Sequence, residues 1–174
     1  MMSRIRAAVL LLASCLLASL MVGAPSVASA SDSEMSVKRA GKYYLKVVCK
    51  ANKQMDKFDR VLLGKKDVIY YKDYKGKRLE KVRKAADPAS DASFRAGAKL
   101  ENPPADWPAE IESRVEKVSR SYLKMSDQFD NVAYKGRSRS FDAVIETERI
   151  AKRSARHSKR VRAFLNLPRN GKGC

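Results

Sequence analysis

The feature that most constrains the fold is a set of apolar residues spaced by three and four positions along most of the chain. The pattern is longest where it comprises Ile111, Val115, Val118, Tyr122, Met125, Phe129 and Val132. Alternation between these two spacings places side chains on one face of a helix. Such a face must be buried against other helices, so this segment predicts a long helix in an all-α protein.

Three further segments have the same period but differ in the size of their side chains. The first segment is bulky and comprises Tyr44, Val48, Ala51, Met55, Phe58 and Leu62. The second is rich in small residues and comprises Leu79, Val82, Ala86, Ala89, Ser93, Ala96 and Leu100. The last is expected from about Ser138 to Leu165, with a seam of Val144, Thr147, Ala151, Ser154, Ser158, Val161 and Leu165. Because bulky and small faces fill each other's space, we predict an antiparallel up-down four-helix bundle.

Prolines lie where breaks and ends of these helices are expected. Asp87-Pro88 is expected to interrupt the second helix, with Asp87 as the N-cap of its second half. If that segment were irregular, the alternative fold would be a three-helix bundle. Asn102-Pro103-Pro104 ends the second helix, and Asp106 or Trp107 is expected to cap the third, with Pro108 in its first turn.

The beginning of the chain is typical of an export signal. Arg4 and Arg6 precede an apolar run over residues 7–22, and Ala28-Ser29-Ala30 offers small residues for cleavage. We therefore predict a signal peptide at residues 1–30, a short polar lead at 31–36, and a helical bundle domain with a C-terminal tail at 37–174. The expected location is outside the cytoplasm, either secreted or associated with the cell envelope.

Cys15 raises an alternative to simple cleavage. Leu12-Ala13-Ser14-Cys15 fits the consensus for lipoprotein processing, in which the cysteine is acylated and becomes the new N-terminus. Apolar residues continue from Leu16 to Val22, whereas a lipidated cysteine normally opens a polar tether. Cleavage after Ala30 is therefore favoured, and a lipid anchor at Cys15 is the alternative.

Cys49 and Cys174 are the two cysteines that remain after the signal. An even pair in an oxidising compartment predicts a disulfide bond. In an up-down bundle the end of the last helix lies beside the start of the first, and residues 166–174 could reach roughly 30 Å when extended. The tail is thus long enough to return to Cys49.

The charge of the chain indicates anionic partners. The net charge is +18, and removal of Arg4 and Arg6 with the signal lowers it to +16. Nine basic residues and no acidic residue lie between Arg149 and Cys174. Helical spacing places the candidate anion-binding residues on one side of the last helix: Arg149, Arg153, Arg156 and Arg160. A solvated outer face is the alternative interpretation.

A second candidate surface lies at one end of the expected bundle. The first and third connections meet at the same end, and they bring together Tyr70, Tyr71, Tyr74, Lys75, Tyr134, Lys135 and Arg137. Tyrosines among basic residues can stack on rings and bind phosphates or carboxylates. The alternative is that the tyrosines cap the core with their hydroxyls in water.

The sequence contains no motif for a catalytic, metal or cofactor site. The single histidine, His157, lies between Arg156 and Lys159, where like charge disfavours protonation. No nucleophile motif, glycine-rich phosphate loop or metal-ligand spacing is present. Specific recognition of nucleic acid is also not expected, because the motifs that read bases are missing. We therefore predict no cofactor and no enzymatic activity.

Three short segments resemble known sequences: Tyr43-Tyr44-Leu45-Lys46-Val47-Val48-Cys49 with Asn52, the turn Pro103-Pro104-Ala105-Asp106-Trp107-Pro108, and the ending Phe164-Leu165-Asn166-Leu167-Pro168. They resemble uncharacterised secreted or lipid-anchored helical proteins of high-GC Gram-positive bacteria. The resemblance implies an exported helical domain. The charge predicts that this domain associates with anionic envelope polymers or lipid head groups. The alternative function is a helical protein–protein interaction module of the cell envelope.

Overall fold

The computed structural model describes residues 34–66, 68–168 and 174. The chain divides into two units, Met1–Ala30 and Ser31–Cys174, and every described residue belongs to the second. The predicted signal peptide and Cys15 lie outside the described residues. Cleavage after Ala30 and lipidation therefore stay predictions.

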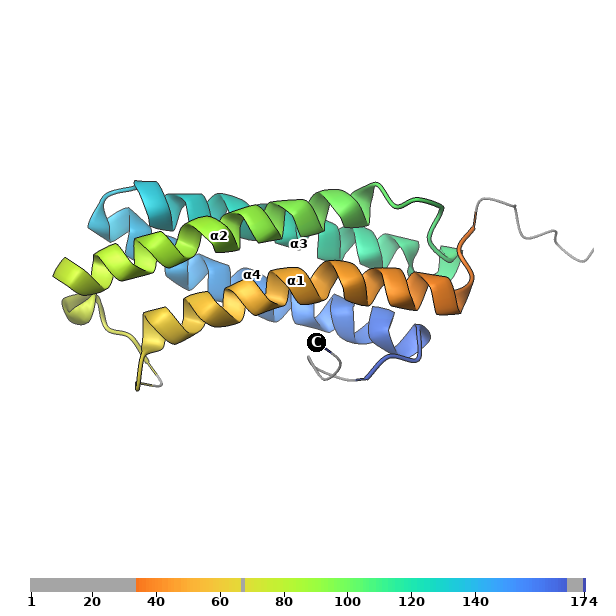
Figure 1. Cartoon of the computed structure of the whole chain (residues 1–174), viewed down its shortest axis with the longest axis horizontal. Coiled ribbons are helices and arrows are strands. Elements are labelled where there is room, and N and C mark those ends of the chain that lie inside the picture. The colour runs from red at the N-terminus through yellow and green to blue at the C-terminus, as the bar shows by residue number, and fades with distance from the viewer. Residues whose placement is uncertain (1–33, 67, 169–173) are drawn as a thin grey trace, which may run out of the picture. The chain divides into compact units, whose positions relative to one another are not determined.

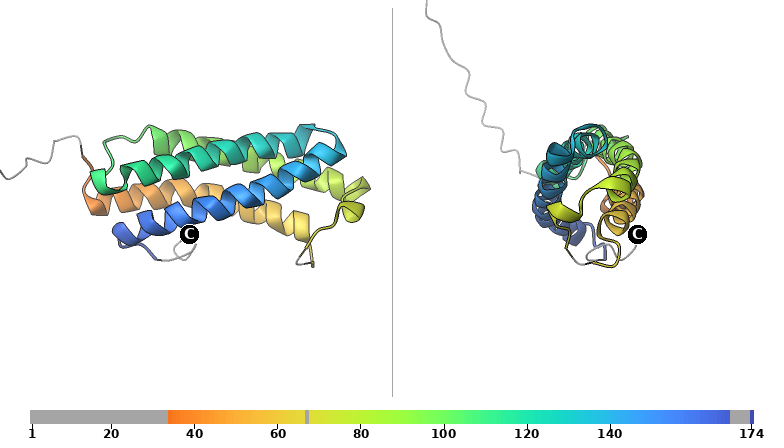
Figure 2. Two further views of the ribbon diagram at one scale, coloured as in Figure 1. Left: turned by 180° about the vertical axis from the view of Figure 1, so that it is seen from behind. Right: turned by 90° about the vertical axis from the view of Figure 1, so that its left-hand side faces the viewer.

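Helices make up almost all of the described structure, and they form the bundle that the sequence predicts (Figure 1). The helices are α1 (Val37–Leu63), α2 (Gly76–Glu101), α3 (Ala109–Tyr134) and α4 (Arg137–Phe164), and a short 3-10 helix η1 (Tyr71–Asp73) precedes α2. The main contacts join α1 to α2, α2 to α3 and α3 to α4. Seen end-on, the helices surround a common core (Figure 2). The four-helix prediction is confirmed and the three-helix alternative is wrong.

The bulky faces of α1 and α3 fill this core as predicted. Every residue of the α3 stripe, from Ile111 to Val132, is buried. On α1 the predicted residues are also buried except Met55, which is partly covered. Phe58 and Phe129 meet in an edge-to-face contact with ring centroids 4.9 Å apart, which joins α1 to α3.

The predicted break at Pro88 is wrong, because α2 continues through it. A proline inside a helix removes the hydrogen bond to the carbonyl four residues earlier. Here that carbonyl belongs to Lys84, and both Lys84 and Pro88 are exposed, so water can satisfy it. Ala86, Ala89 and Ser90 around the proline are buried, so packing holds both halves on the core. Asp87 is not an N-cap, and its carboxylate accepts a hydrogen bond from Tyr134.

Small residues bring α2 and α3 unusually close. The Ser119 hydroxyl donates to the Gly97 carbonyl at 2.8 Å, and the Ser90 hydroxyl donates to the Ser126 carbonyl at 3.2 Å. A hydroxyl on one helix can reach the main chain of the next only when no bulky side chain separates them. The small-residue stripe of α2 therefore has a structural role as the contact face for α3.

The end of α4 folds differently from the prediction. Ser154, Val161 and Leu165 of the predicted seam are buried, but Ile150 and Arg162 are also buried and were not expected. Arg162 Nε donates to the Pro168 carbonyl at 2.7 Å, and the Arg162 carbonyl accepts from the Leu167 amide at 2.8 Å. These bonds turn the chain back after α4, and the returning segment covers Arg162.

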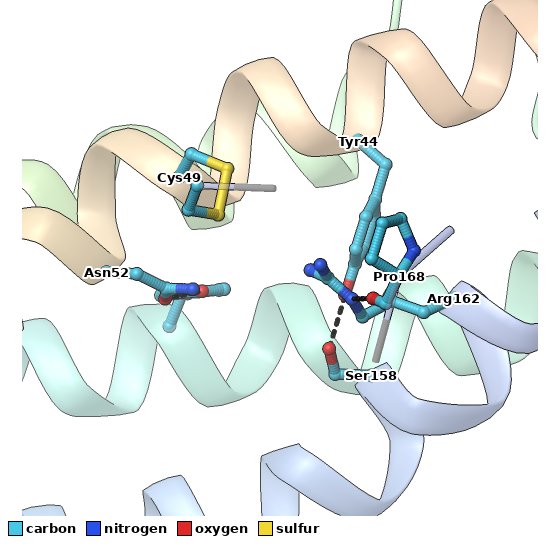
Figure 3. Close-up of a disulfide and its surroundings, with 8 residues drawn as sticks. Tyr44, Cys49, Asn52, Ser158, Arg162 and Pro168 are labelled. Atoms are coloured by element: carbon cyan, nitrogen blue, oxygen red, sulfur yellow. Dashed lines mark hydrogen bonds between the residues drawn. A yellow bond between two sulfur atoms is a disulfide. The ribbon is translucent and has the colours of Figure 1, made fainter. Parts of the chain in front are cut away.

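The predicted disulfide is present. Cys49 in α1 and Cys174 are bonded, with their Cα atoms 5.0 Å apart, and the bond spans 125 residues (Figure 3). Nearby, the Tyr44 hydroxyl donates to Ser158 Oγ at 2.9 Å and so links α1 to α4. The bond ties the end of the chain to the middle of α1.

Replacement of Gly97 by valine should destabilise the bundle. A Cβ at Gly97 would lie 2.6 Å from Leu123 Cγ and 3.1 Å from the Ser119 carbonyl oxygen. Overpacking of this kind costs about 1–3 kcal/mol, which urea denaturation would measure. Gly136→Thr is the control, since nothing lies within 4 Å of a Cβ there and threonine is tolerated as well as glycine at the N-cap of α4; it should change stability by less than about 0.5 kcal/mol. Equal effects of the two substitutions would contradict the close packing of α2 on α3.

Removal of the disulfide should cost a large part of the stability. For Cys49→Ser/Cys174→Ser we expect a loss of about 4 kcal/mol in the free energy of unfolding, because the unfolded chain regains the freedom of a loop that spans 125 residues. Urea denaturation of the variant, beside the wild-type chain with and without reductant, measures this loss. The reduced wild type should match the variant. Two free thiols in peptides of the non-reduced protein would argue against the bond itself.

Candidate functional site

The arginines predicted to bind anions lie on one exposed face of α4. Arg149, Arg153, Arg156 and Arg160 are all exposed. Arg149 forms an ion pair with Glu146, at 3.4 Å. In the described ranges the other three form no ion pair. Their charges are therefore not neutralised by the protein itself.

The adjacent helix α3 extends this face with two basic residues that the sequence reasoning missed. The pKa of His157 is held below its usual value by partial burial and then by the positive charges of Lys117, Arg160, Arg114 and Arg156. Arg114 and Lys117 of α3 therefore lie close to α4. We call the combined group the α3–α4 basic surface, and it comprises Arg114, Lys117, Arg149, Arg153, Arg156 and Arg160. The sequence shows that Arg114 and Lys117 are three residues apart and so share one side of a helix. It does not show the register of α3 against α4, which brings them beside the arginines.

The loop-end candidates divide into two groups. Tyr74 is fully buried, so the expectation that it belongs to an exposed loop end is wrong. Ser140 donates to the Val132 carbonyl at 2.9 Å, so the Tyr74 hydroxyl donates to Ser140 Oγ at 2.6 Å. Arg137 donates to the carbonyls of Tyr71 and Tyr74 and lies 4.1 Å from the centre of the Tyr71 ring. Arg137 thus holds the first connection against α4.

The second group lies against α2. The Tyr134 hydroxyl donates to Asp87, and the Lys135 carbonyl accepts from Arg83 at 2.6 Å. Tyr70, Tyr71 and Tyr134 remain exposed at 58%, 44% and 72%. Lys75 is also exposed, but as the N-cap residue of α2 it makes no side-chain capping bond. The structure joins Tyr71, Tyr74 and Arg137 and leaves Tyr134 and Lys135 with different neighbours.

A hollow that the sequence did not reveal runs along both sides of α1, with a volume of about 1560 Å³. It exists because α1 packs on α2, whereas α1 and α4 do not form a main helix pair. On the side toward α4, helix geometry assigns it a set of lining residues that we call the α1–α4 groove: Asn52, Met55, Asp56, Asp59, Leu63, Val144, Ile145, Thr147, Glu148, Ala151 and Cys174. Cys174 is among them, so the disulfide lies beside this groove.

Acidic side chains from two helices meet at this groove. The pKa of Asp59 in α1 is raised by burial and then by the negative charges of Asp56 and of Glu148 in α4. Glu148 also forms an ion pair with Lys152, which is exposed. Five cations of α1 also line the hollow, but helical periodicity places them on the outer face of α1 or on its α2 side: Lys46, Lys50, Lys53, Lys57 and Arg60. Three carboxylates, those of Asp56, Asp59 and Glu148, are thus brought together on the α4 side of α1.

The described part of the chain offers no site for a metal ion, since no group of three or more histidine, cysteine, aspartate or glutamate side chains is suitably placed. None of its helices has both the length and the apolar character that a membrane span requires. The disulfide is compatible with an extracellular location. Comparison with protein families, curated proteins and solved structures finds no match to this chain.

The pKa of His157 depends on nearby cations of the α3–α4 basic surface. Because burial and four neighbouring cations disfavour its charged form, its titration midpoint should lie below 6.5. The chain has one histidine, so a single imidazole signal in a proton NMR titration gives the value without assignment. Substitution of Arg114 and Lys117 by glutamine should raise the midpoint toward 6.5. A midpoint that does not respond to this substitution would place α3 and α4 in another register.

Proposed function

We propose that this chain is an exported, non-enzymatic helical protein that associates with anionic polymers of the cell envelope or with anionic lipid head groups. The observation that carries the proposal is the α3–α4 basic surface. Six cations from two helices gather there, and Arg153, Arg156 and Arg160 have no acidic partner in the described ranges. Such a surface attracts phosphates and carboxylates by charge and by the bidentate geometry of arginine.

Packing favours a surface that works while the bundle stays folded. The opposite face of α4 is buried in the core through Ala143, Val144, Ile150 and Val161. α4 therefore does not need to leave the bundle to present its arginines, and the apolar face that it would need to enter a bilayer is largely packed in the core. Binding should follow charge and should weaken as salt concentration rises.

Export is part of this proposal. The apolar run and the small residues before Ser31 are those of a signal peptide. The disulfide bond fits an oxidising compartment. After cleavage at Ala30, charge alone would hold the protein at the envelope, whereas a lipid on Cys15 would add a tether.

Neutralisation of the arginines should release the protein from anionic surfaces. For the variant with Arg149, Arg153, Arg156 and Arg160 changed to glutamine, we expect at least about tenfold weaker partitioning onto vesicles that contain anionic phospholipid, since each cation contributes about 1 kcal/mol there. The measurement is co-sedimentation at several salt concentrations. The matched control neutralises four exposed lysines elsewhere: Lys38, Lys42, Lys81 and Lys84. It carries the same net charge and should bind more tightly than the arginine variant.

Two results would contradict this proposal. One is binding that depends on neither salt nor the arginines. The other is equal weakening in the two charge variants, which would mean that net charge alone governs association. If binding were resistant to salt and were lost on Tyr71→Ala, the alternative of a protein-docking loop end would be favoured, because Val68, Tyr70 and Tyr71 are exposed there.

A further inference from the structure

The α1–α4 groove has a feature that the proposed envelope binding does not use, namely an apolar base beneath acidic walls. Met55 and Leu63 of α1 and Ile145 and Ala151 of α4 line it, and all four are only half-buried. These side chains are apolar, and α1 and α4 are not packed together as a main pair. An apolar strip of this kind is stabilised when another apolar surface covers it.

The acidic side chains beside the apolar strip favour a positively charged partner. Asp56 and Asp59 lie on α1, Glu148 lies on α4, and Asp59 is close enough to both others to feel their charge. Glu148 already has Lys152 as an exposed partner, whereas Asp56 and Asp59 form no ion pair in the described ranges. An approaching cation would relieve the repulsion around Asp59. This cluster of three carboxylates departs from the average charge of a chain whose net charge is +18.

We propose that the α1–α4 groove binds an amphipathic helix of a partner protein that carries lysine or arginine beside its apolar face. The apolar face of the partner would cover Met55, Leu63 and Ala151, which are only half-buried, and its cations would pair with Asp59 and Glu148. This inference does not rest on the α3–α4 basic surface, which involves other residues and the opposite charge.

A helix fits this groove better than an extended peptide does. No strand borders the groove in the described residues, so an extended chain would find no ladder for its backbone N–H and C=O groups. A helix satisfies those groups internally and offers one apolar stripe. Along α1 the groove runs from Asn52 to Leu63, about 16 Å at 1.5 Å per residue, which matches about three turns of a partner helix.

The test uses two synthetic helical peptides and a matched pair of protein variants. Both peptides are labelled and share one leucine face, which is flanked by lysines in one and by glutamates in the other. Fluorescence anisotropy with residues 31–174 should show that the lysine peptide binds about tenfold more weakly to Asp59→Asn/Glu148→Gln than to wild type. The control is Asp142→Asn/Glu146→Gln, which makes the same charge change on the α3 side of α4 and should leave this affinity unchanged.

The melting temperature distinguishes loss of the binding site from loss of the fold. Because Asp59→Asn/Glu148→Gln removes repulsion between like charges, its melting temperature should equal or exceed that of wild type. The glutamate peptide should bind to basic surfaces of the protein. Its affinity should therefore be the same for wild type and for Asp59→Asn/Glu148→Gln. The inference is overturned if the two variants bind the lysine peptide equally. It is also overturned if the groove variant binds the glutamate peptide more weakly, or if sedimentation shows that the wild type is a dimer which the groove variant dissociates.

Discussion

The close approach of α2 to α3 is the contact on which the rest of the bundle depends. Alanine, serine and glycine on α2 let Ser119 and Ser90 hydrogen bonds cross between the two helices. α1 then packs on the free side of α2, and α4 packs on the free side of α3. Since α2 and α3 take up the tightest contact, α1 and α4 are the outer members of the series. Their separation is the physical origin of the α1–α4 groove.

The disulfide and the returning tail compensate for this weak pairing of α1 with α4. Cys174 is bonded to Cys49, and the Tyr44 hydroxyl reaches Ser158 across the same side of the bundle (Figure 3). Arg162 is covered as the chain turns back and binds the Pro168 carbonyl. The Tyr44–Ser158 hydrogen bond thus joins α1 to α4, and the disulfide joins α1 to the last residue of the chain, while apolar and acidic side chains line the open groove.

Charge is divided between two surfaces of opposite sign. Basic residues of α3 and α4 gather around His157, where they disfavour its protonated form. Acidic residues of α1 and α4 gather around Asp59, where they disfavour its ionised form. A protein built in this way could hold an anionic surface with one side of α4 and a basic partner helix with the other.

The helices, their buried stripes and the disulfide could be predicted from the sequence, because each depends on a short repeat or on a single residue pair. The α3 stripe from Ile111 to Val132 and the Cys49–Cys174 bond are examples. Pro88 was misinterpreted because local preference favours a break, whereas packing on both sides of it favours one helix. Tyr74 and Arg162 were expected near water, and their burial depends on chain segments that return from elsewhere.

The candidate surfaces show the same limit. The sequence alone determined that Arg149, Arg153, Arg156 and Arg160 share one side of a helix, since that follows from the 3.6-residue turn. Only the tertiary structure decided that Arg114 and Lys117 join them and that Asp59 faces Glu148 across a groove. The physical reason is that periodicity fixes the direction of a side chain about its own helix axis. The register and spacing between two helices depend on the packing of every side chain in the interface.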